Sequence, residues 1–461
     1  MTVTCSVVGL GKLGASMAAV IASRGHLVMG FDVNDRAVEA INQGRTPVAE
    51  TGLAELIRAN SERLQATSNL AEAVLRSDVT FVVVPTPSDA NGGFSLQHAA
   101  VAFEGIGRAL AGKSEYHLIV LTSTVLPGAT RFGLLPILEA AAGKRCGDDF
   151  GLCYGPELIA LGSVIQDLLN PDFKLVGQFD QRSGDGLEAL YGSILVNGAP
   201  CSRMTIENAE LTKIALNSYV TTKISFANML AELCERIPGG DIDVVSGALG
   251  RDARIGRRYL TGALGYGGPC FPRDNHALSF LARELGVNAH LAEATEAVND
   301  AIVGQIVERL GLEIDSGTRV AILGLAYKPG TPVVEASQAV SLARALAAAG
   351  AEVVAFDPLG GDEARRELGS EVLVVDTLHE CVSDAEIIMI TSPDPAFQGL
   401  GAEDLAADKT TVIVVDFWRI LDPEAMTDRR IEYRAVGKSV NDGANSDRLL
   451  ALWGLSFAES S

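Results

Sequence analysis

The chain lacks the features that mark several large classes of protein. Its seven cysteines include no C-x-x-C pair and its six histidines form no cluster, so neither a disulfide framework nor a zinc site is predicted. No apolar run approaches the ~18 residues of a membrane-spanning helix, and no cationic stretch precedes an apolar run at the N-terminus. We therefore expect a cytoplasmic protein that holds no metal and has no membrane partner.

Basic residues are scarce relative to acidic ones. The 461 residues include 37 lysines and arginines against 58 aspartates and glutamates, which gives a formal net charge of −21. A surface this acidic repels nucleic acid and anionic lipid, so we expect neither as a partner. A small anionic ligand remains possible because it feels only its local pocket. The length predicts two or three domains.

The first ~190 residues alternate strands with helices. Short unbroken apolar runs are typical of buried parallel strands. Such runs lie at Val3–Val8, Leu27–Phe31, Val79–Val84, Leu118–Leu121, Gly151–Tyr154 and Lys174–Val176. Helical patterns lie between them, so this segment is predicted to be a doubly wound α/β domain.

A long helix and a second α/β unit follow. Residues 205–236 show helical spacing without glycine or proline, and Pro238-Gly239-Gly240 ends the pattern. Shorter helices continue to about Leu310. Further strands are predicted at Arg319–Leu323, Glu352–Phe356, Val372–Val375, Ile387–Ile390 and Val412–Val415, with a helix at Ser337–Ala349. The predicted fold is α/β, with two Rossmann-like doubly wound domains joined by a long central helix and a helical dimerisation block. The predicted domains are 1–200, 201–312 and 313–461.

A glycine-rich turn follows the first strand. Gly9, Gly11 and Gly14 open a helix, and glycines there permit a tight turn and the close approach of a pyrophosphate. Asp32 ends the second strand, where a carboxylate accepts hydrogen bonds from a ribose and disfavours a 2′-phosphate. The pattern predicts NAD binding in preference to NADP, and the alternative is a structural turn. The second α/β unit lacks a full G-x-G-x-x-G.

One cysteine lies in the most glycine-dense loop, which spans residues 265–274. Proline suits a first helical turn, and the pattern after it predicts a helix over Asn275–Leu285, so Cys270 would lie near a helix N-terminus beside Arg273. The helix dipole and the cation both favour a thiolate. Asp274 adds a carboxylate four residues on. Cys270 is a candidate nucleophile, and the alternative is a buried structural cysteine.

Other polar residues lie at strand ends and on the long helix. Pro85 and Thr86 follow one strand and Thr124 follows another, where they could reach a cofactor or form plain turns. Glu210, Lys213 and Asn217 share one helix face. That face is either an exposed polar stripe or a source of groups that stabilise negative charge on oxygen. The residue spacing alone does not distinguish these two alternatives.

A thiol and NAD together can oxidise an aldehyde. The thiolate adds to it, hydride leaves to NAD, and water hydrolyses the thioester. If an alcohol is oxidised first in the same place, two NAD are consumed for each acid formed.

In these motifs the chain resembles the UDP-glucose/GDP-mannose dehydrogenases, which oxidise the C6 alcohol of a sugar nucleotide to a carboxylate in two NAD-dependent steps. The resemblance spans nearly the whole chain in order. It is carried by the Gly9–Gly14 turn, Asp32, Pro47-x-x-Glu50-x-Gly52-Leu53, Val84-Pro85-Thr86-Pro87, Ser123-Thr124-Val125, Pro156-Glu157, Asn170-Pro171-Asp172, Ala209–Asn217, the Cys270 loop, Leu323–Pro329 and Asp357-Pro358.

The resemblance implies roles for individual residues. Cys270 is the nucleophile, Lys213 and Asn217 stabilise oxyanions, and Asp274 and Thr124 position water. A further set is implied to act in thioester hydrolysis or to bind the sugar nucleotide: Glu157 as the base, Leu158, Ile159, Tyr266, Gly267, Gly268, Arg254 reaching the sugar of a neighbouring subunit, and Lys328 and Arg419 on the nucleotide. The family also implies a nucleotide-binding third domain and a homodimer or higher homo-oligomer.

Three positions depart from the family pattern. Leu161 stands where the family has a glutamate, Thr122 where it has a lysine, and Glu335 where it has an arginine. The base and the sugar are therefore open, while the C6 chemistry is expected to remain.

The expected activity is four-electron oxidation of a UDP-hexose, UDP-glucose to UDP-glucuronate above all. The alternatives within the class are GDP-mannose and UDP-N-acetylhexosamine 6-dehydrogenases. A two-electron β-hydroxyacid dehydrogenase would need neither Cys270 nor a third domain. A catalytically silent sensor of nucleotide sugars would have lost the nucleophile or Lys213, and neither is missing.

Overall fold

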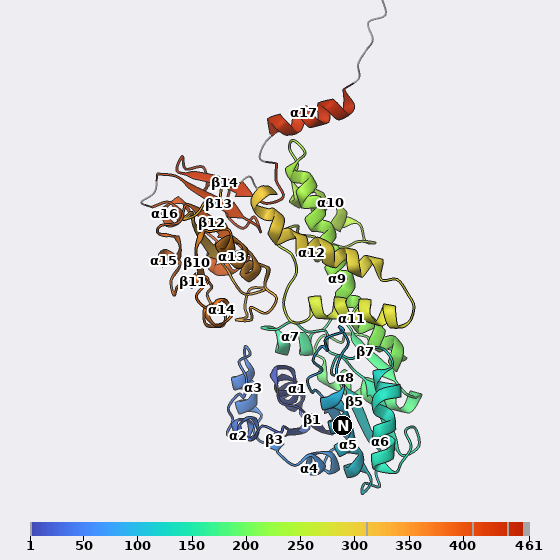
Figure 1. Cartoon of the computed structure of the whole chain (residues 1–461). Helices are drawn as coiled ribbons and strands as arrows, with labels where there is room; N and C mark the ends of the chain where they lie inside the picture. Colours follow the sequence, from blue (N-terminus) through green and yellow to red (C-terminus); the bar gives the residue numbers. More distant parts are fainter. Residues whose placement is uncertain (1, 310–311, 408–409, 440–441, 455–461) are drawn as a thin grey trace, which may run out of the picture. The chain divides into compact units, whose positions relative to one another are not determined.

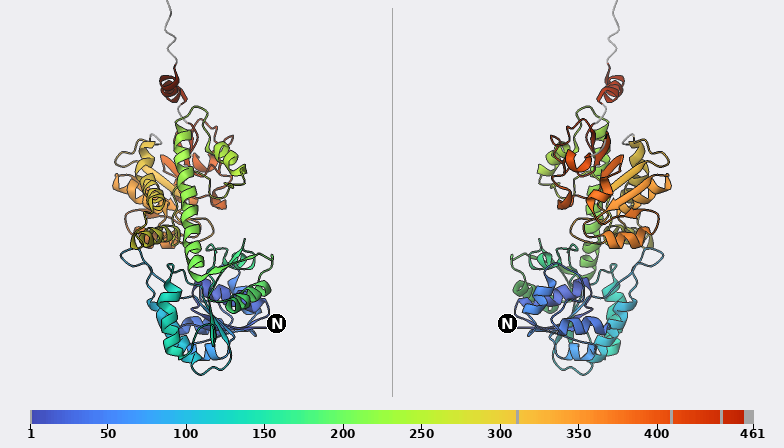
Figure 2. Two further views of the ribbon diagram at one scale, coloured as in Figure 1. Left: turned by 90° about the vertical axis from the view of Figure 1, so that its right-hand side faces the viewer. Right: turned by 90° about the vertical axis from the view of Figure 1, so that its left-hand side faces the viewer.

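The structure is a computed structural model that describes residues 2–309, 312–407, 410–439 and 442–454. It divides into two compact units, Met1–Leu216 and Asn217–Ser461. The division falls within α9 (Ile206–Glu235), which is a single unbroken helix (Figure 2). The predicted long helix is confirmed to within one residue at each end. The two units are described separately.

The first unit is built on an eight-stranded sheet within the described residues, in the order β3-β2-β1-β4-β5-β6-β7-β8. Figure 1 shows strands of this sheet among the helices of the unit. All neighbouring pairs in it are parallel except β6 and β7. The strands are β1 (Thr4–Val8), β2 (Leu27–Phe31), β3 (Leu64–Thr67), β4 (Val79–Val82), β5 (His117–Leu121), β6 (Phe150–Tyr154), β7 (Lys174–Gln178) and β8 (Cys201–Thr205).

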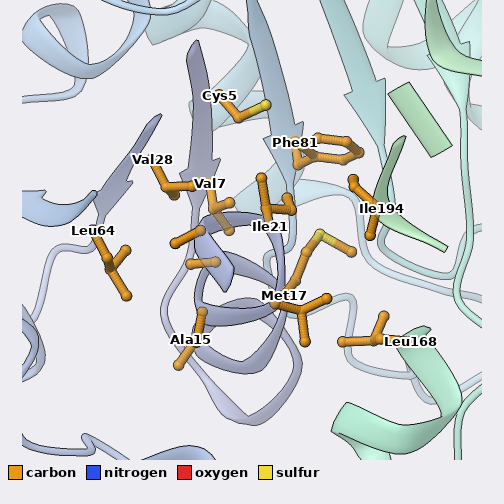
Figure 3. Close-up of a cluster of buried hydrophobic side chains, with 14 of the residues drawn as sticks. Cys5, Val7, Ala15, Met17, Ile21, Val28, Leu64, Phe81, Leu168 and Ile194 are labelled. Carbon is orange, nitrogen blue, oxygen red and sulfur yellow. The ribbon is translucent and has the colours of Figure 1, made fainter. Parts of the chain in front are cut away.

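Helices cover both faces of this sheet. Successive strand residues enter opposite cores. Val7 and Phe81 pack with α1 on one face (Figure 3), and Val8 and Val82 pack with α5 on the other. The helices are α1 (Lys12–Ser23), α2 (Asp35–Asn42), α3 (Leu53–Ala59), α4 (Leu70–Leu75), α5 (Gln97–Leu110), the π-helical turn Ala129–Leu134, α6 (Leu135–Ala142), α7 (Val164–Leu169) and α8 (Gln181–Ile194).

The second unit carries a parallel six-stranded sheet within its described residues, in the order β11-β10-β9-β12-β13-β14. Its strands are β9 (Arg319–Leu323), β10 (Glu352–Phe356), β11 (Leu373–Val374), β12 (Ile387–Ile390), β13 (Val412–Asp416) and β14 (Ile431–Ala435). Its helices are α10 (Ile242–Arg251), α11 (Phe271–Glu284), α12 (His290–Arg309), α13 (Gln338–Ala348), α14 (Gly361–Leu368), α15 (Leu378–Val382), the 3-10 turn Pro395–Phe397, α16 (Ala402–Leu405) and α17 (Asp442–Trp453).

The central strands agree with the apolar runs, and the prediction of two doubly wound parallel sheets is confirmed. The implied parallel direction of Lys174–Val176 is wrong, because β7 runs antiparallel to β6. The segment between these strands contains the six-residue α7, about 9 Å long, and the chain stays at the carboxyl edge of the sheet instead of crossing back to the opposite edge. The strand β7 therefore begins at the edge where β6 ends.

Candidate active site

The turn after β1 fits a dinucleotide. Gly9 has a φ of +99°, and a Cβ there would lie 2.2 Å from the carbonyl oxygen of Val83. A Cβ on Gly14 would lie 1.8 Å from the carbonyl oxygen of Gly9, whereas nothing lies within 4 Å of a Cβ on Gly11. The fold itself requires Gly9 and Gly14. Gly11 leaves open space at the N-terminus of α1, where a pyrophosphate is stabilised.

Asp32 lies at the end of β2 beside that turn. Its Oδ2 accepts a hydrogen bond of 2.6 Å from the Leu10 N–H, and its Oδ1 accepts one of 2.8 Å from the Asn34 N–H. The side chain is half-buried and keeps acceptor capacity, since a carboxylate has about four acceptor positions. This arrangement fits a ribose diol.

The segments that follow β4 and β5 are bonded to each other. The Thr86 hydroxyl donates to the carbonyl oxygen of Thr124 at 2.7 Å, and the Ser123 hydroxyl donates to that of Val84 at 2.6 Å. Pro85 between them is exposed, and Thr124 is half-buried. Predicted residues from two loops thus meet at the carboxyl edge of the sheet.

Glu157 follows β6 and is buried. Its carboxylate forms an ion pair with Lys174, the first residue of β7, and the two residues are 6% and 4% exposed. Leu158 is half-buried, and Ile159 and Leu161 pack against the core of the first unit. The role of Lys174 was not predicted from the sequence. The sequence feature that could have indicated it is a lysine at the start of an apolar run, two residues after Asp172.

The polar face of α9 is buried at the three predicted positions. Glu210 accepts hydrogen bonds from the N–H groups of Gly128 and Thr130 at 2.6 and 2.9 Å, and burial raises its pKa. Lys213 and Asn217 are 9% and 8% exposed. These burials exclude a solvated polar stripe. Glu210 stabilises the turn after β5, and Lys213 and Asn217 occupy the following helical turns.

Cys270 is the N-cap residue of α11, and it is exposed, while the other six cysteines are buried or half-buried. The helix was predicted to begin at Asn275 and begins at Phe271, because Pro272 fits its first turn. The thiol therefore lies at the positive end of the helix dipole, which favours a thiolate.

A buried hydrogen bond supports the first turn of α11. The Asn217 side-chain amide donates to Asp274 Oδ2 at 2.6 Å, and Asp274 is 3% exposed. The Asp274 N–H donates to the carbonyl oxygen of Cys270 at 2.9 Å. A residue of α9 is thus connected through Asp274 to the cysteine backbone.

The glycine loop before Cys270 is held on two sides. The Tyr266 N–H donates to Asn299 Oδ1 at 2.7 Å, and the Gly268 N–H donates to the carbonyl oxygen of Glu335 at 3.0 Å. A Cβ on Gly267 would lie 2.2 Å from the carbonyl oxygen of Ala336. Asn299 was missed, and its only signal is an amide inside an otherwise helical pattern.

A Cβ on Gly268 would lie 2.5 Å from the ring of Tyr327. Tyr327 and its neighbour Lys328, whose Nζ is 5.9 Å from that ring, are half-buried. The charge on Cys270 adds to burial in raising the pKa of Tyr327. Tyr327 therefore packs against the glycine loop that precedes Cys270.

Two predicted arginines differ sharply in environment. The Arg254 side chain is 88% exposed and pairs with Asp252. The Arg419 side chain is 4% exposed, donates to Asp243 Oδ2 at 2.9 Å, and also donates to the carbonyl oxygens of Thr261, Gly262, Phe417 and Val436. Arg419 thus stabilises the second unit.

Within the described ranges, no three metal-ligating side chains gather in a way that could hold an ion. No helix of the described part combines the length and the apolar character needed to cross a bilayer.

A dinucleotide turn and a cysteine at a helix N-terminus are together features of NAD-dependent dehydrogenases. Comparison with known proteins specifies the group. Three models of one family match in order: the NAD binding domain over residues 3–195, the central domain over 207–301 and the UDP binding domain over 321–423. The chain belongs to the UDP-glucose/GDP-mannose dehydrogenase family and is an NAD-dependent nucleotide-sugar 6-dehydrogenase.

Individual relatives match over nearly their whole length. A UDP-glucose 6-dehydrogenase of Haloferax volcanii is 36% identical over 420 residues, covering 90% of this chain and 96% of the relative. A GDP-mannose 6-dehydrogenase of Azotobacter vinelandii is 32% identical over 428 residues, covering 89% and 96%. The structure of a UDP-glucose dehydrogenase from Pyrobaculum islandicum is 34% identical with a TM-score of 0.84, covering 95% and 98%. The predicted family, fold and cofactor are confirmed.

Proposed function

We propose that the chain oxidises C6 of UDP-glucose to the carboxylate of UDP-glucuronate and consumes two NAD per sugar. The observation that carries the proposal is the exposed Cys270 at the start of α11, supported by the buried Asn217–Asp274 hydrogen bond. UDP-glucose is favoured over GDP-mannose because one UDP-glucose 6-dehydrogenase is 36% identical to this chain, above the 32–33% of the GDP-mannose 6-dehydrogenases, although a second UDP-glucose 6-dehydrogenase is 30% identical.

The first unit would hold the cofactor. Gly11 leaves room for the pyrophosphate at the N-terminus of α1, and Asp32 would accept hydrogen bonds from the adenosine ribose. Thr86 and Thr124 would line the carboxyl edge of the sheet. When bound, NAD accepts a hydride from C6 in each of the two oxidations.

Cys270 would attack the C6 aldehyde after the first oxidation. A C–S bond forms, the carbonyl becomes an oxyanion, and the product is a thiohemiacetal. Lys213 and the Asn217 amide would stabilise that oxyanion, since both are buried donors where such interactions are strongest. Loss of a second hydride from C6 leaves a thioester on Cys270.

Water would then cleave the thioester. Glu157 would take a proton from the water as it attacks C6, and Asp274 and Thr124 would orient it. The C–S bond breaks and the thiolate leaves. The sum is R–CH2OH + 2 NAD⁺ + H2O → R–COO⁻ + 2 NADH + 3 H⁺.

The sugar nucleotide would be bound by backbone groups of residues 265–268, together with Tyr266 and Lys328. Leu158 and Ile159 would contact the sugar. Arg419 would also contact the nucleotide, and its guanidinium donates to five protein acceptors that hold it in place.

We further propose a cytoplasmic homodimer. Apolar side chains lie exposed along the part of α9 that belongs to the second unit, with exposed fractions of 44–65% at Tyr219, Phe226, Met229 and Leu233. The exposed Arg254 would reach the sugar bound by the partner. Sedimentation of a Phe226→Glu variant tests this: the account predicts a monomer, and an unchanged dimer contradicts it.

The yield of NADH per mole of sugar tests the proposed activity. UDP-glucose, UDP-N-acetylglucosamine, GDP-mannose and dTDP-glucose are each supplied in limiting amount with excess NAD. Two NADH from UDP-glucose are expected. One NADH per substrate would indicate a two-electron dehydrogenase, no turnover of any sugar would indicate a sensor, and preference for another sugar would reassign the substrate.

A further inference from the structure

Glu157 and Lys174 face each other because of the reversed direction of β7. In the antiparallel β6–β7 pair, Tyr154 lies opposite Gly177. Extending that register by three residues on each side places Glu157 opposite Lys174, and their side chains form an ion pair. In a parallel strand the first residue would lie at the other edge of the sheet. Only an antiparallel β7 brings Lys174 to the edge that carries the strand ends β1, β4, β5 and β6.

The surroundings of the pair are otherwise apolar. A cavity of about 20 Å³ lies against Glu157, Lys174 and Tyr191, and its remaining lining consists of apolar side chains of β4, α1, α7 and α8. From α8, the only titratable group facing Glu157 is Tyr191, whose ring lies 4.9 Å from Lys174 Nζ. The cavity is large enough for one water molecule.

Tyr191 stays neutral in this position. Burial and the charge of Glu157 raise its pKa, and the thiols of Cys153 and Cys201 act in the same direction. Its hydroxyl has no hydrogen-bond partner among the described residues. Lys174 is therefore the single cation in this pocket of the described chain that balances Glu157.

Resting on the proposed function of Glu157 as the base of thioester hydrolysis, we propose that Lys174 is a positioning residue that keeps Glu157 ionised and oriented for that step. A carboxylate buried among apolar groups takes up a proton unless an opposite charge stabilises it, and a protonated carboxyl cannot accept the proton of water. Lys174 binds Oε2 alone. A carboxylate has about four acceptor positions, so capacity for the attacking water remains.

The inference predicts a defect confined to hydrolysis. In Lys174→Gln, both hydrides should transfer within about threefold of the wild-type rate, because Cys270, Lys213 and Asn217 are untouched. Release of the acid should slow by about 100-fold at pH 7, the usual range for a lost general base. The pH of half-maximal hydrolysis should rise by about 1–3 units, so that activity recovers in alkaline solution.

A single-turnover experiment measures both steps. The folded, full-length enzyme in excess reacts with UDP-glucose and saturating NAD from pH 6 to 9.5, NADH is followed by absorbance, and free UDP-glucuronate is quantified after an acid quench. Lys174→Arg should retain the wild-type profile because it keeps the cation. Lys144→Met, which removes another lysine of the first unit that donates to the carbonyl oxygen of Lys113, is the matched control and should also be unchanged.

The double variant Glu157→Gln/Lys174→Met provides a second test in case Lys174→Gln does not fold. It leaves no buried charge unpaired, so it should fold and hydrolyse slowly at every pH, without alkaline recovery. An unchanged hydrolysis profile in Lys174→Gln, or alkaline recovery in the double variant, would overturn the inference. If the wild type yields one NADH per sugar, the proposed function itself fails. This result is distinct from the two hydrolysis results that would overturn the inference about Lys174.

Discussion

The turns that follow the first strand of each sheet, β1 and β9, are built alike. In each, a glycine of positive φ follows the first strand, Gly9 at +99° and Gly324 at +105°. Each glycine N–H donates at 2.8 Å to the last carbonyl of the second strand, and the next residue donates to the aspartate that follows that strand, Asp32 at 2.6 Å and Asp357 at 2.7 Å.

The two turns differ in the acceptor positions and the open space that they leave for a ligand. Asp357 is 8% exposed and accepts from the N–H groups of Leu325, Ala326, Leu359 and Gly360, whereas Asp32 is half-buried and accepts from two. The position of Gly11 is taken by Ala326 in the second turn. A glycine–aspartate pair therefore builds the turn in both units, while open space and unused acceptor positions distinguish the one suited to a dinucleotide.

The largest expected effect separates binding in the first unit from chemistry in the second. Cys270→Ser should lower acid formation by at least about 10³-fold, because a hydroxyl is a far weaker nucleophile than a thiolate. The NAD dissociation constant should change less than twofold, since the turn at Gly9 is untouched. Steady-state assays and calorimetry measure the two quantities. Full turnover by the variant would refute the nucleophile assignment.

Removing each aspartate should break the two turns in different ways. Asp357→Ala leaves four backbone donors without their acceptor and should lower the free energy of unfolding by about 3–5 kcal/mol. Asp32→Ala should cost no more than about 2 kcal/mol, while it weakens NAD about 10- to 100-fold and relaxes discrimination against NADP. Urea unfolding and cofactor titration test both. Equal losses of stability would contradict the comparison.

Exchanging the residue that differs sharpens the contrast. Gly11→Ala should leave stability within about 1 kcal/mol, because no atom lies within 4 Å of the added Cβ, yet it should weaken NAD about 10-fold by filling the pyrophosphate space. Ala326→Gly is the matched change in the second turn and should create no NAD binding. Unaltered NAD affinity in Gly11→Ala would show that the open space is not used.

A more gradual effect concerns acid. Burial and the nearby charge of Lys113 lower the pKa of His117 to about 3, well below the value near 6.5 of an unfolded chain. As pH falls below 6.5, the unfolded state gains a proton that the folded state does not bind. The stability of the first unit should therefore fall by up to about 1.4 kcal/mol per pH unit down to about pH 3.

Urea titrations between pH 7.5 and 5 measure that slope. His117→Gln should flatten it, while His379→Gln in the second unit, whose ring is not deeply buried, should not. A slope that persists in His117→Gln would assign the acid sensitivity to other groups.

The sequence predicted the central strands well because they are buried on both faces, so that Ile387–Ile390 is apolar without interruption. It missed β3, β8 and β14, which lie at sheet edges and mix exposed polar residues with apolar ones. The direction of β7 was mispredicted because an apolar run does not indicate whether its strand is parallel or antiparallel to its neighbour.

The site was predictable where local chemistry is unusual. The glycine spacing predicts the turn after β1, and the prolines on both sides of Cys270 predict the start of a helix. Lys174 and Asn299 were missed because their partners, Glu157 and Tyr266, come together only through the fold. For Arg419, the motif position predicts a ligand contact, and the protein acceptors of its guanidinium could not be predicted from residue spacing.

The most direct test of the account is mass spectrometry of the Glu157→Gln protein, quenched in acid during turnover of UDP-glucose with NAD. Slow hydrolysis should leave the oxidised sugar nucleotide bound as a thioester, and peptide mapping should find the added mass on the peptide that contains Cys270. Two NADH per sugar without any adduct, or an adduct on a different residue, would contradict the central claim.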